Sequence, residues 1–261
     1  MLMLEIKYVT CSGTNETTNV YQLVNLLQFF PLAEIGVQVS AEQCLQKVGR
    51  LEWIRALEVQ VRREKMEINA ALHVNNGWVA DLGQGIIAPE LLELLKMKGI
   101  DGRPFFRRVQ LNFKVGREQT PDLRKLGNLL EDFPQHRFIL SYNDSNKALI
   151  EQLYERGRDF DLLYDGSFGK GITPDTRPAP IWPGVLQGYA GGIGPDNVSK
   201  TLDDIYANWK LKPNYAGVYI DAQRRLEDNE GHFDLRLCSA YLREVYAWKW
   251  RMEHYEAASV S

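Results

Sequence analysis

The chain has 261 residues, of which 44% are hydrophobic and 25% charged, close to the globular average, so the composition excludes a largely disordered protein. The 31 Lys and Arg residues against 34 Asp and Glu residues give a net charge of −3, which argues against bulk electrostatic binding to nucleic acid or an anionic membrane. Three widely spaced cysteines and four scattered histidines form neither a disulfide framework nor a zinc motif.

The N-terminal segment, MLMLEIKYVTCSG, has neither the basic start nor the long apolar run of a signal peptide. No stretch approaches the roughly 18 apolar residues that a membrane-spanning helix needs. We therefore expect a soluble protein of a reducing cytoplasm, with neither nucleic acid nor membrane as a partner.

Short apolar runs alternate with amphipathic helical stretches along the chain. In the first half, the expected strands are 5–11, 34–39, 68–75 and 107–113, and the expected helices are 19–30, 51–64, 89–98 and 121–132. The last two helices each open with proline, a residue favoured in the first turn.

The second half continues this alternation. The expected strands are 137–142, 160–165, 185–190 and 215–221, and the expected helices are 145–156, 195–209 and 234–254. A stretch rich in Gly and Pro, 166–184, follows the sixth strand instead of a clear helical pattern.

Eight strand–helix units in about 250 residues predict a (β/α)8 barrel, or TIM barrel. We expect one domain over 1–261, in which an irregular loop replaces or shortens the sixth helix and 257–261 form a frayed tail. An open, doubly wound α/β sheet is the alternative architecture.

The barrel fold predicts where the functional site lies. Reacting groups of such barrels lie at the C-terminal ends of the strands and in the loops after them. The polar or small residues that end the expected strands are Cys11, Ser40, Asn75, Asn112, Asn143, Asp165, Gly191, Gly192 and Asp221. We expect these residues to converge on one mouth of the barrel.

The segment YAGGIGPDNV, 189–198, resembles the seventh-strand loop of the phosphoribosylanthranilate isomerase family, which typically has AGG-x-x-P-x-NV there. Further motifs of the family are similar in the same order. They are LHVN at 72–75, VQLN at 109–112, LLYDGSFGKG at 162–171 and the stretch from Asp221 to Asp234. Cys11 resembles the cysteine that ends the family's first strand. The resemblance spans nearly the whole chain and implies a (β/α)8 barrel.

The resemblance also implies a reaction, the Amadori rearrangement of an aminoaldose phosphate to an aminoketose phosphate, as in tryptophan biosynthesis. That reaction needs a general acid to open the sugar ring and a general base to remove the neighbouring proton, and it needs no cofactor or metal. By resemblance, Asp165 is the expected acid and Cys11 the expected base. From the residues alone, Asp165 is equally compatible with an Asx turn, and Cys11 with a small buried hydrophobic residue.

The expected phosphate site combines Gly191 and Gly192 with the N-terminus of the helix that follows them, because backbone amides and a helix dipole attract anions. The alternative for the two glycines is a tight strand exit. Arg224 and Arg225 could add positive charge at this corner, fill the space of the phosphate, or pair with neighbouring acidic residues at the surface.

The expected polar contacts of a substrate are Gln110, Asn112, Asn75 and Asp221. We expect His73 to pack inside the barrel, because no second histidine or carboxylate lies at metal-ligand spacing. The segment GSFGKG, 166–171, lacks the Ser or Thr of a phosphate-binding P-loop, so we interpret it as a loop beside Asp165.

The C-terminal stretch is rich in aromatic residues at helical spacing. Tyr241, Val245 and Trp248 share one face, which we expect to pack on the core. Tyr246 and Trp250 lie on other faces, and a helix that is apolar on more than one face could pack against a second copy of the chain, giving a homodimer.

Three hypotheses follow, because the chain also departs from the family pattern at Val9, at Asn112 and at 223–225. The first is a sugar-phosphate isomerase that acts on a small phosphorylated or anionic substrate. The second is a barrel enzyme acting on another small polar substrate. The third is a non-catalytic barrel that binds a small molecule and has lost the isomerase chemistry.

Overall fold

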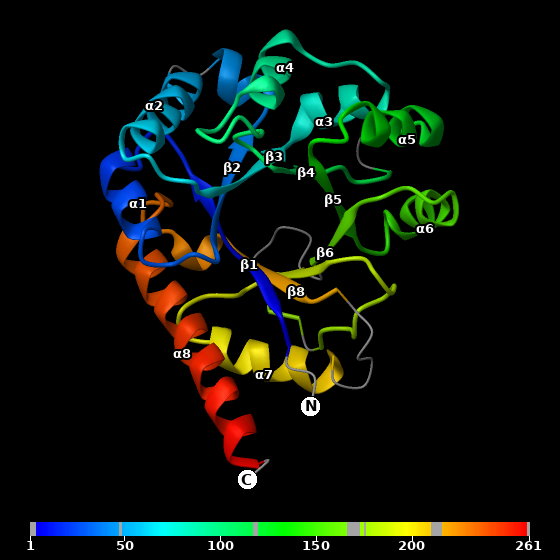
Figure 1. The fold of residues 1–261 in the computed structure, drawn as a ribbon. Helices are drawn as coiled ribbons and strands as arrows, with labels where there is room; N and C mark the ends of the chain where they lie inside the picture. The colour runs from blue at the N-terminus through cyan, green and yellow to red at the C-terminus, as the bar shows by residue number, and fades with distance from the viewer. Residues whose placement is uncertain are drawn as a thin grey trace.

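The structure is a computed structural model, and it describes residues 4–46, 49–116, 120–165, 173–174, 176–209 and 216–259. Its strands are β1 (Ile6–Thr14), β2 (Ala33–Val39), β3 (Asn69–Val74), β4 (Arg108–Leu111), β5 (Arg137–Tyr142), β6 (Asp161–Asp165), β7 (Gln187–Ala190) and β8 (Val218–Ala222). Each strand pairs in parallel with the next, and β8 closes the barrel against β1 (Figure 1). The predicted (β/α)8 barrel is therefore confirmed.

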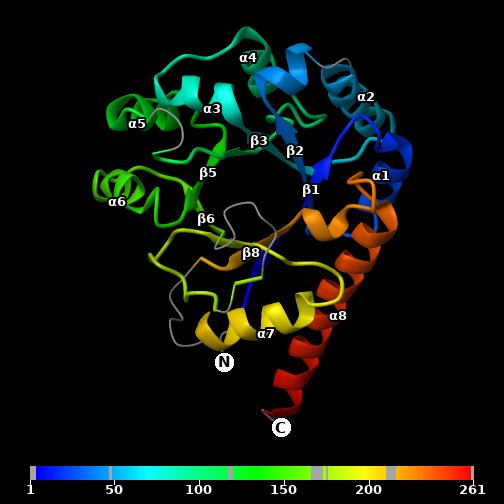
Figure 2. The same ribbon diagram turned by 180° about the vertical axis from the view of Figure 1, so that it is seen from behind.

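The helices form a layer around the barrel, as the view from behind also shows (Figure 2). They are α1 (Val20–Leu27), α2 (Arg50–Arg63), α3 (Asn76–Gly83), α4 (Pro89–Lys96), α5 (Leu123–Asp132), α6 (Lys147–Glu155), α7 (Val198–Trp209) and α8 (Leu235–Ser259). Two short turns add a π-helix at Glu42–Gln46 and a 3₁₀-helix at Arg224–Leu226. Helix α5 begins after Asp122, not at Pro121, because the Asp122 side chain caps it by accepting a hydrogen bond from the Lys125 N–H.

Helix α3 is an element that the sequence pattern did not predict. It follows β3 directly, and its buried residues include Trp78, Val79 and Leu82. The run of two asparagines and a glycine that opens it is more typical of a loop, and Asn76 has a positive φ of 51°. The burial of one apolar face against the barrel therefore outweighs the weak local helix propensity.

The connection from β6 to β7 is described only in part. Its described residues, 173–174 and 176–186, contain no helix. The segments 166–172 and 175 lie outside the described residues, and GSFGKG with Lys170 lies there too. An irregular loop in place of the sixth helix therefore stays a prediction for 166–172 and 175.

Alternate residues of β1 face opposite sides of the barrel wall. The Thr10 and Ser12 hydroxyls point inward, where they hydrogen-bond to Glu34 and Asp221. Val9 and Cys11 are 0% exposed and belong to the hydrophobic core between strands and helices. This period of two determines which residues reach the interior.

A cluster of paired charges fills the interior at the end where the strands begin. The Arg108 guanidinium donates to Glu34 at 2.8 Å and to Asp161 at 3.2 Å, and the three side chains are at most 2% exposed. Its carbon lies 4.4 Å from the ring centre of Tyr8 and 4.0 Å from that of Tyr219. The barrel interior is therefore packed, not open as a pore.

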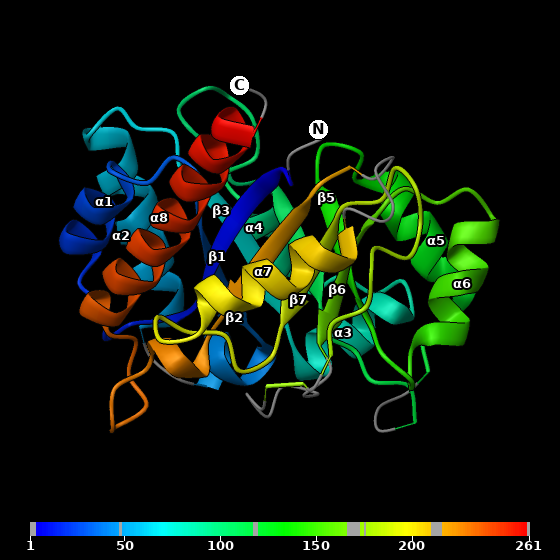
Figure 3. The ribbon, with the colours of Figure 1, turned by 90° about the horizontal axis from the view of Figure 1, so that it is seen from below.

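Helix α8 runs along the barrel, and the N- and C-termini both lie at the end where the strands begin (Figure 3). The predicted core face is confirmed, because Tyr241, Val245 and Trp248 are at most 1% exposed. Trp250 is 59% exposed. A homodimer and a frayed tail at 257–261 stay predictions: α8 extends to Ser259, and 260–261 lie outside the described residues. No described helix has both the length and the apolar character needed to cross a membrane.

Candidate active site

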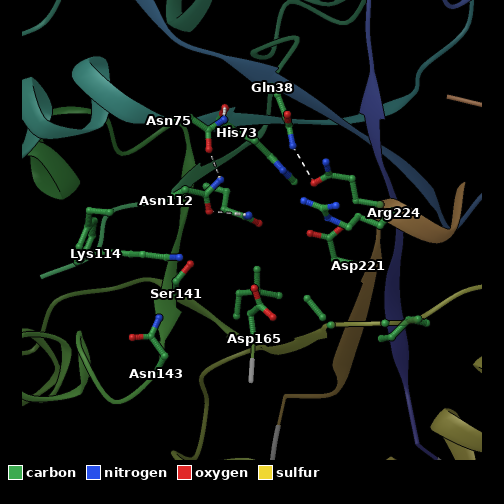
Figure 4. Close-up of a pocket in the computed structure, with 18 of the residues that line it drawn as sticks. Gln38, His73, Asn75, Asn112, Lys114, Ser141, Asn143, Asp165, Asp221 and Arg224 are labelled. Carbon is green, nitrogen blue, oxygen red and sulfur yellow. Dashed lines mark hydrogen bonds between the residues drawn. The ribbon is translucent and has the colours of Figure 1, made fainter. Parts of the chain in front are cut away.

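A cavity of about 360 Å³, here called the mouth pocket, opens at the end of the barrel where the strands finish. Residues at or just after the ends of β2 to β8 line it (Figure 4). The lining residues that the sequence predicted are Asn75, Gln110, Asn112, Asn143, Asp165, Gly191, Gly192, Asp221, Arg224 and Arg225. The structure thus brings together the expected site residues except Cys11 and Ser40.

Cys11 does not reach the mouth pocket. Its side chain is 0% exposed, on the outer side of β1, and belongs to the hydrophobic core together with Cys238 of α8. Burial raises the pKa of the Cys11 thiol well above its ordinary value, and Cys238 adds to this rise. The thiol thus stays protonated and out of reach of a ligand, so the expected general-base role of Cys11 has no geometric support. Ser40 is also absent from the lining; its hydroxyl accepts the Gln43 N–H in the next turn.

Asp221 is the most strongly perturbed carboxyl group of the mouth pocket. Asp221 lies near the end of β8 and is 8% exposed. Its Oδ1 accepts a hydrogen bond of 2.6 Å from the Ser12 hydroxyl. Burial raises the pKa of Asp221 to about 7, and the charges of Glu34 and Asp165 contribute to the rise. A carboxyl group with this pKa can both donate and accept a proton at neutral pH.

Asp165 ends β6 and lies across the mouth pocket from His73 in the close-up (Figure 4). It is partly buried, and its charge acts on Asp221. Two carboxyl groups therefore face one cavity, with Asp221 the more deeply buried. Such pairs are typical of sites that transfer protons.

A chain of carboxamide side chains crosses the wall formed by β3 and β4. Asn75 Nδ2 donates to the backbone carbonyl of His73, Asn112 Nδ2 donates to Asn75 Oδ1, and Gln110 Nε2 donates to Asn112 Oδ1, each at 2.9 Å. A backbone carbonyl can only accept, so it determines the direction of the whole chain. The chain therefore leaves Gln110 Oε1 as an acceptor at its end.

Two buried polar atoms of the pocket lining have no hydrogen-bond partner among the described residues. They are Gln110 Oε1 and His73 Nε2; Gln110 is 4% exposed and His73 is 2% exposed. His73 and Gln110 are paired across β3 and β4, so the two atoms lie on the same face of neighbouring strands. Burial, with the charge of Arg108, lowers the pKa of His73 to about 3, so its imidazole is neutral.

Gly36 of β2 makes the space for this arrangement. A Cβ at this position would lie 2.3 Å from Ser12 Oγ and 2.7 Å from His73 Cε1. Real Cβ atoms do not approach other atoms so closely, so only glycine allows the serine and the imidazole to share this part of the interior. The expectation that His73 packs inside the barrel is thus met, and its side chain also reaches the pocket.

The loop after β7 presents backbone N–H groups to the same pocket. Among the described residues, no group accepts a hydrogen bond from the N–H of Gly191, Gly192 or Ile193. Gly191 and Gly192 have positive φ values of 90° and 61°, and a Cβ on Gly192 would lie 2.4 Å from Thr173 Oγ1. The glycines are therefore required by the tight strand exit, and the same geometry leaves their amides available to an anion. Helix α7 begins only at Val198, and its N-terminus is not part of the lining.

Arg224 and Arg225 differ in their contacts. The Arg225 guanidinium pairs with Asp196 at 2.6 Å, whereas no described carboxylate pairs with Arg224. The Arg224 side chain points into the mouth pocket beside Asp221 (Figure 4). Arg224 is thus the arginine of this corner that can contact an anionic ligand, and Arg225 behaves as an ordinary surface charge.

Sequence reasoning missed several polar residues of the lining. They are Gln38, Lys114, Ser141, Gln223 and the pocket-facing role of His73. The available signal was the period of two, because each inward-facing residue lies two positions from another inward-facing residue of its strand.

No group of three or more His, Cys, Asp or Glu among the described residues could hold a metal ion.

Comparisons with known proteins give structural neighbours only. No known protein family and no curated protein matches the sequence. KGPDC from Streptococcus mutans is 10% identical with a TM-score of 0.48, and the match covers 93% of this chain and 99% of that one. A GH18 chitinase from Pseudoalteromonas aurantia is 8% identical with a TM-score of 0.47, covering 92% and 99%. The YdjI aldolase from Escherichia coli K12 is 10% identical with a TM-score of 0.42, covering 94% and 88%. Similarity at this level says nothing about the ligand of the mouth pocket.

Proposed function

We propose that this chain is an isomerase that converts a phosphorylated aldose, or its sugar amine, to the corresponding ketose form by general acid–base catalysis. The observation that supports this most directly is the carboxyl pair in one cavity, in which burial raises the pKa of Asp221 to about 7. An Amadori-type rearrangement needs one group that donates and one that accepts a proton. The sequence resemblance to phosphoribosylanthranilate isomerase points to the same reaction.

The proposed roles differ from those that the resemblance implied, because Cys11 lies outside the pocket. Asp221, protonated, donates its proton to the ring oxygen of the sugar, and the ring opens. Asp165 removes the proton from C2 and gives an enediol or enolamine. Asp165 then returns this proton to C1, and the C2 hydroxyl gives its proton back to Asp221 as C2 becomes a carbonyl. Arg224 and the amides of Gly191 and Gly192 bind the phosphate and orient the sugar between the two carboxyl groups.

The test is solvent exchange. Purified protein is incubated in D₂O with D-ribose 5-phosphate and, separately, with phosphoribosylanthranilate. Ketose formation and deuterium at C1 of the ketose or C2 of the recovered aldose are measured by NMR. We expect exchange with at least one of the two compounds. Asp221→Asn and Asp165→Asn should each lower the rate by about 10²–10⁴. Asp132→Asn, at the exposed end of α5, is the matched control and should leave the rate unchanged.

Two results would contradict the proposal. One is a folded wild-type protein that exchanges neither compound. The other is an exchange rate that neither Asp221→Asn nor Asp165→Asn lowers. Binding without exchange would favour the non-catalytic alternative, a barrel that binds a small anionic molecule without chemistry. The buried position of Cys11 supports this alternative, because it removes the thiol from an isomerase mechanism.

A further inference from the structure

The unpartnered atoms of His73 and Gln110 specify which chemical group the mouth pocket accepts. Gln110 Oε1 is an acceptor, because the carboxamide chain that ends on the His73 carbonyl uses the Gln110 amide nitrogen as a donor. A buried acceptor without a donor is unfavourable, because it has lost its hydrogen bond to water and gained none in the protein. A ligand that supplies a donor at this place therefore recovers a contact that the free protein lacks.

A hydroxyl group satisfies both atoms together. It donates its proton to Gln110 Oε1, and its oxygen accepts a hydrogen bond from the neutral imidazole of His73 when Nε2 is protonated. The two residues are paired across β3 and β4, so their side chains extend from the same face of neighbouring strands and both line the mouth pocket. A carboxylate or an ether oxygen has no proton to donate and would leave Gln110 Oε1 unpaired.

The rest of the lining offers little surface to an aromatic ring. Only four of its 20 residues have apolar side chains, namely Phe113, Leu163, Ala190 and Ile193. The accessible walls are carboxamides, hydroxyls and charges, including Gln38, Asn75, Asn112, Ser141 and Gln223. These groups match the hydrogen-bonding needs of several hydroxyl groups, and aromatic surface is poorly matched by them.

We infer that His73 and Gln110 together bind one hydroxyl group of the substrate, and that the substrate beyond its anionic end is a hydroxyl-bearing, non-aromatic chain. This inference rests on the proposed function only in taking the mouth pocket as the substrate site. It departs from the aryl amine that the family resemblance implies. The anionic end lies at the corner of Arg224 and the Gly191 and Gly192 amides, which line the same pocket.

The test is calorimetric binding of two phosphate monoesters of similar size to the full-length chain. D-ribose 5-phosphate presents hydroxyl groups and phenyl phosphate presents a ring. We expect D-ribose 5-phosphate to bind at least tenfold more tightly. Gln110→Met, which keeps the side-chain length but removes the acceptor, should weaken D-ribose 5-phosphate about tenfold and leave phenyl phosphate unchanged. His73→Leu should have the same selective effect, and Gln152→Met, on the exposed face of α6, should have none.

Phenyl phosphate binding as tightly as D-ribose 5-phosphate, equal losses for both ligands in Gln110→Met and His73→Leu, or no binding of either ligand would overturn the inference. If Gln110→Met does not fold, the wild-type comparison and His73→Leu still decide. Tight, selective binding without solvent exchange would keep this inference and remove the proposed isomerase. Exchange of phosphoribosylanthranilate by a protein that prefers phenyl phosphate would do the reverse.

Discussion

The two ends of the barrel interior both contain buried polar side chains, but only where the strands begin are the described buried charges paired with one another. At the end where the strands begin, Arg108 lies between Glu34 and Asp161 and between two aromatic rings. At the mouth, Asp221 has one neutral hydrogen-bond donor, and His73 Nε2 has no partner among the described residues. Charges that satisfy one another stabilise the fold, whereas buried polar groups without partners are typical of a site that a ligand completes.

The largest loss in the free energy of unfolding should come from removing Arg108 from the cluster of paired charges. Arg108→Met removes the cation from between Glu34 and Asp161, which leaves Glu34 without a paired charge and Asp161 with Arg137 alone. We expect a loss of about 3–5 kcal/mol in the free energy of unfolding, measured by urea denaturation. Arg107→Met, the neighbouring residue in exposed ion pairs with Glu67 and Asp101, is the matched control and should lose far less. Equal losses would show that the buried position of Arg108 has no special weight.

At the mouth, the free energy of unfolding should depend on pH through Asp221. Burial raises the pKa of Asp221 to about 7, above the value of about 4 that a carboxyl group has in an unfolded chain. The protonated carboxyl is therefore favoured by folding. Its stabilising contribution is fully present below about pH 4 and is lost as the pH rises through 7.

Asp221→Asn removes this titration. Relative to the variant, the wild type should lose up to about 4 kcal/mol of unfolding free energy between pH 4 and pH 8. Urea denaturation of both proteins across this range measures the difference. Asp132→Asn should show the same pH dependence as the wild type, since Asp132 lies at the exposed end of α5. Parallel curves for wild type and Asp221→Asn would show that Asp221 titrates normally.

The sequence predicted the fold more completely than the site. The alternation of apolar runs and amphipathic helices gave all eight strands to within a few residues, because a barrel strand is short, buried and bounded by polar residues. It missed α3, whose opening NNG is typical of a loop and whose stability comes from burying Trp78 and Leu82. Local pattern could not reveal a helix that depends on tertiary contacts.

At the site, the sequence placed a residue correctly in the lining where its strand ends on an inward-facing side chain, and wrongly where the strand continues; the roles of these residues stay predictions. Asp165 ends β6 and faces the pocket. Strand β1 continues beyond Cys11 to Thr14, and Ser12, not Cys11, points inward. A one-residue difference reverses the facing of a strand residue, and a motif resemblance does not contain that register. The pairing of His73 with Gln110 is a contact between strands, so no local pattern could predict it.

A smaller effect should follow from overfilling the mouth. Gly36→Ala places a Cβ 2.3 Å from Ser12 Oγ and 2.7 Å from His73 Cε1, so both side chains must move. We expect a loss of about 1–3 kcal/mol in the free energy of unfolding, as in other overpacked interiors. Gly77→Ala in α3 is the control, because a Cβ there meets nothing within 4 Å. If both variants unfold at the same urea concentration, the interior at Gly36 has room that the structure does not show.

The smallest effect separates the two arginines at the anionic corner of the mouth. Arg224 points into the mouth pocket and pairs with no described carboxylate, whereas Arg225 pairs with Asp196 at the surface. Arg224→Ala should therefore weaken the binding of inorganic phosphate about tenfold at low ionic strength, a typical cost of removing a charge-assisted hydrogen bond. Arg225→Ala should leave phosphate affinity unchanged and so serves as the matched control. Calorimetry on the two variants measures both effects. Because both residues are exposed arginines in the same turn, a nonspecific attraction of phosphate to positive charge would weaken binding equally in both variants. A difference between them would show that the phosphate lies inside the pocket, beside Asp221.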